Sequence, residues 1–195
     1  METLNEQLIN AIIINNTEKI KSLIENGADV NAKDDDGWAP LHYVSVSGNK
    51  DITELLIKSG ADVNIKQNDG LTLLHYASIS GYKKIVELLI KHGADVNIKN
   101  NNGFTPLHCV SVNNHMAIAK LLIKNGANIN AGDRYGDTPL HFASMNSNKK
   151  IVKLLIKNGA NINIKDNCKC TPLEFALIYN LENVVKLLRK HGATE

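Results

Sequence analysis

Short apolar segments with helical spacing alternate along the chain with turns rich in Gly, Asn and Asp. In residues 67–99, Ile85, Leu88 and Leu89 follow the i, i+3, i+4 pattern of one helix face, which predicts a helix over about residues 83–92. A shorter helix is expected over 73–80, after an Asn-Asp-Gly turn and with Thr72 as its N-cap. This segment therefore reads as a tight turn followed by a pair of short helices.

The same pattern recurs at a period of 33 residues. Three columns share that step: Gly-Ala pairs beginning at Gly27, Gly60, Gly93, Gly126, Gly159 and Gly192, histidines His42, His75, His108 and His141, and turn glycines Gly37, Gly70, Gly103 and Gly136. We predict one domain over residues 1–195, without a linker, built from six units: an N-terminal cap (1–33), full repeats (34–66, 67–99, 100–132, 133–165) and a C-terminal cap (166–195). The caps are expected to be atypical because each exposes one face to water.

Two hexapeptides resemble the ankyrin-repeat signature: Gly103-Phe104-Thr105-Pro106-Leu107-His108 and Gly136-Asp137-Thr138-Pro139-Leu140-His141. The stretch Gly-Ala-Asp-Val-Asn at 27–31, 60–64 and 93–97 is similar to the same family. The resemblance covers nearly the whole chain. It implies an all-α solenoid of stacked helix-turn-helix pairs with projecting β-hairpin loops, and a concave face that binds other proteins.

Composition narrows the function classes. The formal net charge of +2 is too balanced for a dedicated binder of nucleic acid or membrane surfaces, and no segment reaches the roughly 18 apolar residues of a membrane span. The N-terminus does not have the pattern of a signal peptide, and three cysteines do not make a disulfide framework, so we predict a cytoplasmic, intracellular protein. Lysine outnumbers arginine 20 to 2, as in A/T-rich genomes, so a bacterial effector acting in a host cytosol is an alternative.

The reactive side chains fit structural roles. We expect the histidine column to hydrogen-bond the capping threonines and neighbouring backbone, and Cys109 to lie in the core. Cys168 and Cys170 do not have the second pair of ligands that a zinc site needs. We therefore predict no metal site, no cofactor and no enzymatic activity. A column of asparagines is expected to close the loops through hydrogen bonds from side chain to backbone: Asn31, Asn64, Asn97, Asn130 and Asn163.

Two columns are the candidate binding surface. The residue after the turn glycine, which in this family points off the hairpin, contributes Trp38, Leu71 and Phe104 as apolar anchors. Positions near the end of each first helix contribute the floor of a groove: Val46, Ile79, Val112 and Met145. Asp35 and Asp36 are expected at the rim of this surface, and polar selectivity is assigned to Arg134, Tyr135 and Asp137. The alternative for the helix column is packing between neighbouring helices.

We therefore predict a monomeric, non-enzymatic module that binds a partner protein through a preorganised face, with neither nucleic acid nor membrane as its target. Two alternatives remain. The chain could be a structural, self-associating scaffold, or it could act by occluding the active site of a cellular or host enzyme.

Overall fold

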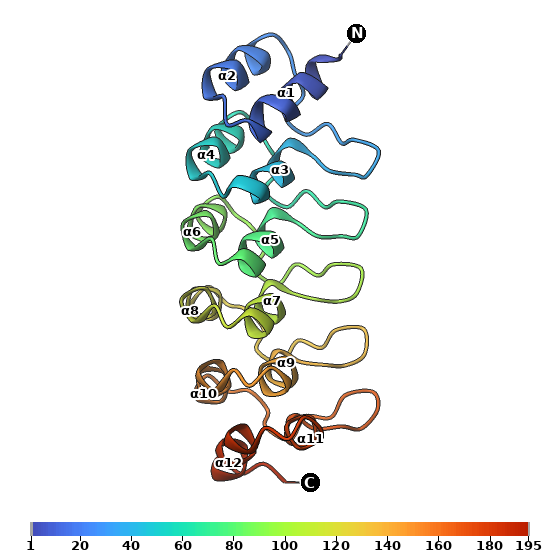
Figure 1. Ribbon diagram of the computed structural model, residues 1–195, viewed down its shortest axis with the longest axis vertical. Coiled ribbons are helices and arrows are strands. Elements are labelled where there is room, and N and C mark those ends of the chain that lie inside the picture. Colours follow the sequence, from blue (N-terminus) through green and yellow to red (C-terminus); the bar gives the residue numbers. More distant parts are fainter. Residues whose placement is uncertain (1, 195) are drawn as a thin grey trace. The chain divides into compact units, whose positions relative to one another are not determined.

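The computed structural model describes residues 2–194, and over that range the chain forms twelve α-helices and no β-strand. The contacts divide the chain into two compact units, residues 1–95 and 96–195, which we call the N-terminal and C-terminal units. Within each unit the helices form consecutive pairs, and a long projecting loop leads into the first helix of every pair except the chain's N-terminal pair (Figure 1). The predicted all-α class with paired helices and projecting loops is confirmed.

The N-terminal unit contains six helices. They are α1 (Leu4–Ile13), α2 (Thr17–Glu25), α3 (Pro40–Ser47), α4 (Lys50–Lys58), α5 (Leu73–Ser80) and α6 (Lys83–Lys91). The first pair lies in the segment predicted as a cap, and its N-terminus is closed by a capping box in which Thr3 and Glu6 bond each other's backbone N–H groups.

The C-terminal unit contains the other six helices. They are α7 (Pro106–Asn113), α8 (Met116–Lys124), α9 (Pro139–Met145), α10 (Lys149–Lys157), α11 (Pro172–Ile178) and α12 (Glu182–Lys190). Four of the six first helices begin with proline, which needs no hydrogen bond to its nitrogen at that position and already has a helical φ.

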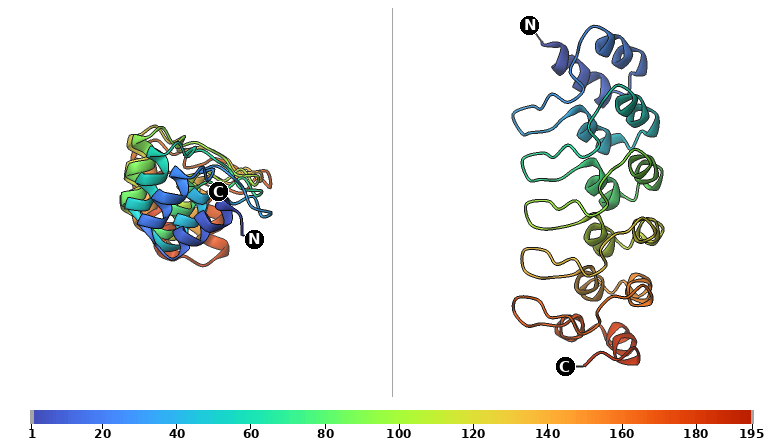
Figure 2. Two further views of the ribbon diagram at one scale, coloured as in Figure 1. Left: turned by 90° about the horizontal axis from the view of Figure 1, so that it is seen from above. Right: turned by 180° about the vertical axis from the view of Figure 1, so that it is seen from behind.

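The two helices of a pair have different surroundings. The odd-numbered first helices lie beside the loops and bury residues around much of their circumference, as α7 does from Pro106 to Ser111. The even-numbered second helices lie on the far side from the loops and are amphipathic, with an apolar face packed inward and lysines outside (Figure 2). The core of each unit is therefore a row of Leu, Ile and Val side chains between helix layers.

A regular turn closes each projecting loop. In the first loop the Asp34 N–H donates to the Trp38 carbonyl (3.0 Å) and the Gly37 N–H to the Asp34 carbonyl (2.9 Å). Gly37 has a φ of +79°, and a Cβ there would stand 2.8 Å from the backbone nitrogen of Asn68 in the next loop. Glycine is therefore required at this turn by both its own conformation and the approach of its neighbour.

The last loop differs because Lys169 occupies the turn position. Its φ is +66°, in the left-handed region that L-residues disfavour, yet the turn bond from its N–H to the Asp166 carbonyl is kept at 3.0 Å. Replacing glycine by lysine thus preserves the tight turn at the expense of backbone strain.

The histidine column links successive repeats. The Thr105 N–H donates to Nδ1 of His108 (3.0 Å), and Nε2 of the same ring lies 3.0 Å from the Asp137 carbonyl in the next repeat. Because Nδ1 accepts, Nε2 carries the proton and donates. The expected role of this column is confirmed, because Nδ1 of His108 also lies 2.8 Å from the hydroxyl of Thr105, the N-cap residue of α7. Two capping threonines, Thr3 of α1 and Thr171 of α11, accept a hydrogen bond from the backbone N–H three residues later, that of Glu6 and that of Glu174 (both 3.2 Å).

The asparagine column also joins repeats. The amide of Asn31 donates to the Gly60 carbonyl (3.0 Å) and its oxygen accepts from the Asp62 N–H (2.8 Å), and Asn97, Asn130 and Asn163 repeat this pair of bonds within the C-terminal unit. These side chains bond to backbone groups, as predicted. The backbone groups belong to the following repeat, however, and not to the loop that carries the asparagine.

Within residues 2–194, every helix is too short or too polar to cross a membrane.

Candidate functional site

Trp38 lies directly after the turn of the first loop in the N-terminal unit. The carboxylate of Asp34 accepts hydrogen bonds from the Asp36 N–H (3.0 Å) and the Trp38 N–H (2.8 Å), which fixes the direction in which the chain leaves the turn. Its other oxygen accepts a hydrogen bond from the Tyr43 hydroxyl on α3. One aspartate therefore ties the loop tip to its own first helix.

The Trp38 ring is half-buried in an aromatic cluster that spans two repeats. Its ring centroid is 5.3 Å from that of Tyr43 and 5.4 Å from that of Tyr76 on α5. The Tyr76 hydroxyl in turn accepts from the amide of Gln67 in the next loop (2.7 Å). Only part of the Trp38 ring is therefore exposed to solvent, and the rest packs against aromatic side chains of two repeats.

The helix positions beside this cluster are more open. Val46 at the end of α3 is 67% exposed and Ile79 at the end of α5 is 39% exposed, whereas Leu71 on the second loop is half-buried. Asp35 and Asp36 lie exposed at the first loop tip. In the N-terminal unit the structure therefore places two exposed apolar side chains on the first helices and an acidic rim on the loop.

The C-terminal unit has a similar cluster built from different residues. The half-buried Phe104 ring lies 4.9 Å from Phe142 on α9 and 5.4 Å from His108 on α7, between ring centroids. Val112 and Met145, the groove positions of these repeats, are half-buried, but Ile178 in the same column of the last repeat is 65% exposed. The predicted groove floor is therefore uneven in this unit, with its most exposed apolar position outside the predicted set.

Arg134 and Tyr135 form a polar tip on the loop between α8 and α9 of the C-terminal unit. The Arg134 guanidinium donates to the Asn102 side chain (2.8 Å) in the preceding loop and lies 4.6 Å above the Tyr135 ring centroid. Tyr135 is 54% exposed. These contacts preorganise a cation and a phenol at an exposed loop tip, the kind of pair that is common at protein interfaces.

The other polar candidate, Asp137, has a raised pKa. Burial, followed by the nearby carboxylates of Asp133 and Asp166, raises its pKa to about 6, and its buried Oδ1 has no hydrogen-bond partner among the described residues. In the N-terminal unit, burial and then Asp34 raise the pKa of Tyr43 to about 12.

Among residues 2–194 no group of three or more His, Cys, Asp or Glu side chains is arranged to hold an ion. Cys109 is buried as expected, and burial raises its thiol pKa to about 12, whereas Cys168 is exposed and Cys170 half-buried in the last loop.

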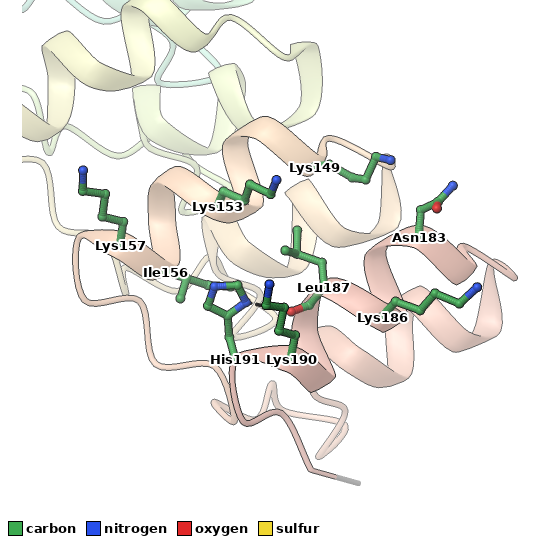
Figure 3. A pocket seen from close by; sticks show the side chains of 9 residues that line it. All are labelled: Lys149, Lys153, Ile156, Lys157, Asn183, Lys186, Leu187, Lys190 and His191. Atoms are coloured by element: carbon green, nitrogen blue, oxygen red, sulfur yellow. Dashed lines mark hydrogen bonds between the residues drawn. The ribbon is translucent and has the colours of Figure 1, made fainter.

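The repeat signature does not predict one further surface, a groove lined by lysines. A groove of about 740 Å³ lies between α10 and α12, where five lysines surround Ile156 and Leu187 (Figure 3): Lys149, Lys153, Lys157, Lys186 and Lys190. The sequence signal is visible at one position of the second helix, which is Glu54 and Glu87 in two repeats but lysine in the next three. This column lies outside the repeat motif, so the motif does not predict its charge.

Comparison with protein families matches residues 8–100, 93–166 and 132–194 to the family described as ankyrin repeats (3 copies). A search of curated proteins finds no match.

Proposed function

Because the chain belongs to the ankyrin-repeat family, whose repeats are generally protein–protein interaction modules and typically non-enzymatic, we propose that it binds a partner protein through its loop tips and first helices. In the N-terminal unit the contact surface comprises Trp38, Leu71, Val46 and Ile79, with Asp35 and Asp36 at the rim. In the C-terminal unit it comprises Phe104, Val112, Met145, Arg134, Tyr135 and Asp137.

The observation that carries this proposal is the exposure of large apolar side chains at the ends of first helices whose other faces are buried. Val46 is 67% exposed although Val44, two residues earlier on α3, is completely buried. A side chain of this kind gains free energy when a partner removes it from water. The loops beside it are already fixed by hydrogen bonds, so binding would order few groups.

Site-specific photo-crosslinking tests the assignment without requiring a known partner. A photoreactive amino acid replaces Val46 in one variant and Ile79 in another. In a matched control variant it replaces Lys84, which is exposed on α6 in the layer of second helices. After irradiation in a cell lysate, we expect the first two variants to capture the same protein and the Lys84 variant not to capture it.

Capture of that protein from position 84 alone would contradict the proposal. Capture of a second copy of this chain from Val46 and Ile79 would favour the self-associating scaffold, and light scattering over a range of concentrations would measure the resulting oligomer.

A further inference from the structure

The groove between α10 and α12 differs in charge from its counterpart in the N-terminal unit. The counterpart, between α4 and α6, is lined by three lysines together with Glu54 and Glu87. Among residues 2–194, five lysines and no carboxylate line the α10–α12 groove. Among the described residues, the one ion pair at its edge is that of Lys186 with Glu182, 3.6 Å apart and highly exposed.

The difference arises at a single repeat position. Glu54 pairs with Lys58 (2.9 Å) and Lys50 (3.4 Å), and Glu87 pairs with Lys83 (3.1 Å), so glutamate neutralises its own helix face. Lys153 occupies the same position on α10, four residues from Lys149 and four from Lys157. Like charges at this spacing repel each other, and an anionic ligand would relieve the repulsion.

The groove also has an apolar floor. Leu187 is buried and Ile156 half-buried between the two rows of lysines, and His191 is held at one end by a hydrogen bond from its Nδ1 to the Leu187 carbonyl (2.8 Å). Lysines four residues apart on a helix are about 6 Å apart along its axis. Carboxylates at i and i+4 of a second helix have the same spacing, so an acidic helix can match this row.

From this charge pattern and floor, we propose that the α10–α12 groove binds an acidic, amphipathic segment of a partner protein. Its carboxylates would pair with the lysines of both helices, and its apolar side chains would contact Ile156 and Leu187. This surface lies on the second helices, away from the loops, so it does not depend on the function proposed above.

Other polyanions fit the groove less well. No Phe, Tyr or Trp lines it, so nucleic-acid bases would have no aromatic side chain to stack on. Its apolar residues lie on the floor of a concavity, where they cannot insert into a bilayer. Both ligands nevertheless enter the test as competitors.

Fluorescence anisotropy of a short labelled peptide with Glu and Leu on adjoining faces of a helix tests the proposal on the full chain. A second peptide carries Gln in place of each Glu. We expect the Glu peptide to bind, the Gln peptide to bind at least tenfold more weakly, and the affinity to fall as salt is raised because exposed charges are screened.

Two charge-reversal variants locate the site. Lys153→Glu with Lys186→Glu changes the proposed groove, whereas Lys84→Glu with Lys91→Glu makes the same change of net charge in the groove of the N-terminal unit. We expect the first variant to lose at least about tenfold in affinity and the second less than about twofold, with the helical circular dichroism of both unchanged.

Equal weakening by the two variants, or equal binding of the Glu and Gln peptides, would overturn the proposal. So would tighter binding of oligothymidylate or of phosphatidylserine vesicles than of the Glu peptide, because the groove would then recognise phosphate.

Discussion

At the scale of single residues, the approach of a neighbouring loop decides which turn positions must be glycine. A Cβ on Gly103 would lie 2.8 Å from the backbone nitrogen of Arg134 in the next loop. Lys169 has a similar φ, but no later loop among the described residues packs on it. The same backbone conformation is therefore occupied by glycine where space is closed and by lysine where it is open.

Two substitutions at this position should change stability in opposite directions. Lys169→Gly removes left-handed strain and should raise the free energy of unfolding by up to about 1 kcal/mol. Gly103→Ala adds that strain and a backbone clash, and should lower it by more than about 2 kcal/mol. Urea denaturation of both variants checks the pair, and a Gly103→Ala protein as stable as the wild type would show that the loops are not closely packed.

At the scale of helices, the second helices combine one packed apolar face with a solvent face whose charge varies. On α6, Lys83 and Glu87 form an i, i+4 pair with both side chains about half-exposed, whereas α10 has lysine at all four of its charged positions. Identical packing can therefore carry different charge, because the outer face contributes little to the core.

Exchanging these charges should alter the stability of each helix modestly. Lys153→Glu creates two possible pairs, with Lys149 and Lys157, and should raise the free energy of unfolding by about 0.3–1 kcal/mol. Glu87→Lys removes the pair with Lys83 and should lower it by a similar amount, about 0.5 kcal/mol. Thermal unfolding at low and high salt measures both, and effects that persist in high salt would not be electrostatic.

The elements themselves were largely predictable from the sequence. The helix expected over 73–80 is observed at those residues, and the one expected over about 83–92 ends at Lys91. Helical spacing, caps and turn glycines are local signals. Because they recur in each repeat, the helices predicted for one repeat can be transferred to the others.

The site was harder to predict because burial depends on side chains one repeat away. The sequence predicts Trp38 and Phe104 as apolar anchors, but the Trp38 ring packs against Tyr76 and the Phe104 ring against Phe142, each in the following repeat. The hydrogen-bond partners of the asparagine side chains likewise cannot be predicted without knowing where the following loop lies. The lysine groove could have been predicted from the sequence by comparing the charge of equivalent residues at a repeat position outside the motif.

At the scale of the molecule, the buried histidines make folding sensitive to acid. Burial lowers the pKa of His42, His108 and His141, that of His108 to about 4. Protonation would place a hydrogen on Nδ1, which faces a backbone N–H donor. The unfolded chain therefore binds more protons than the folded chain below the ordinary histidine pKa of about 6.5.

The free energy of unfolding should accordingly fall as the pH drops from about 6.5 towards 4, by up to about 3 kcal/mol for His108. Asp137 acts in the opposite sense, since its raised pKa makes the folded state gain protons as the pH falls through about 6. Urea denaturation across this pH range, with His108→Gln as the control, separates the contribution of His108 from that of Asp137. An identical pH slope in the variant would show that His108 does not contribute.

The requirement for glycine where loops meet also limits how such an array could lengthen by duplication. A copied repeat placed after residues 166–195 would bring a new loop against the turn at Lys169, whose Cβ would occupy the space that Gly103 and Gly136 leave empty for their neighbours. Growth of the chain in that direction would therefore need a mutation to glycine at 169 before, or together with, the added segment.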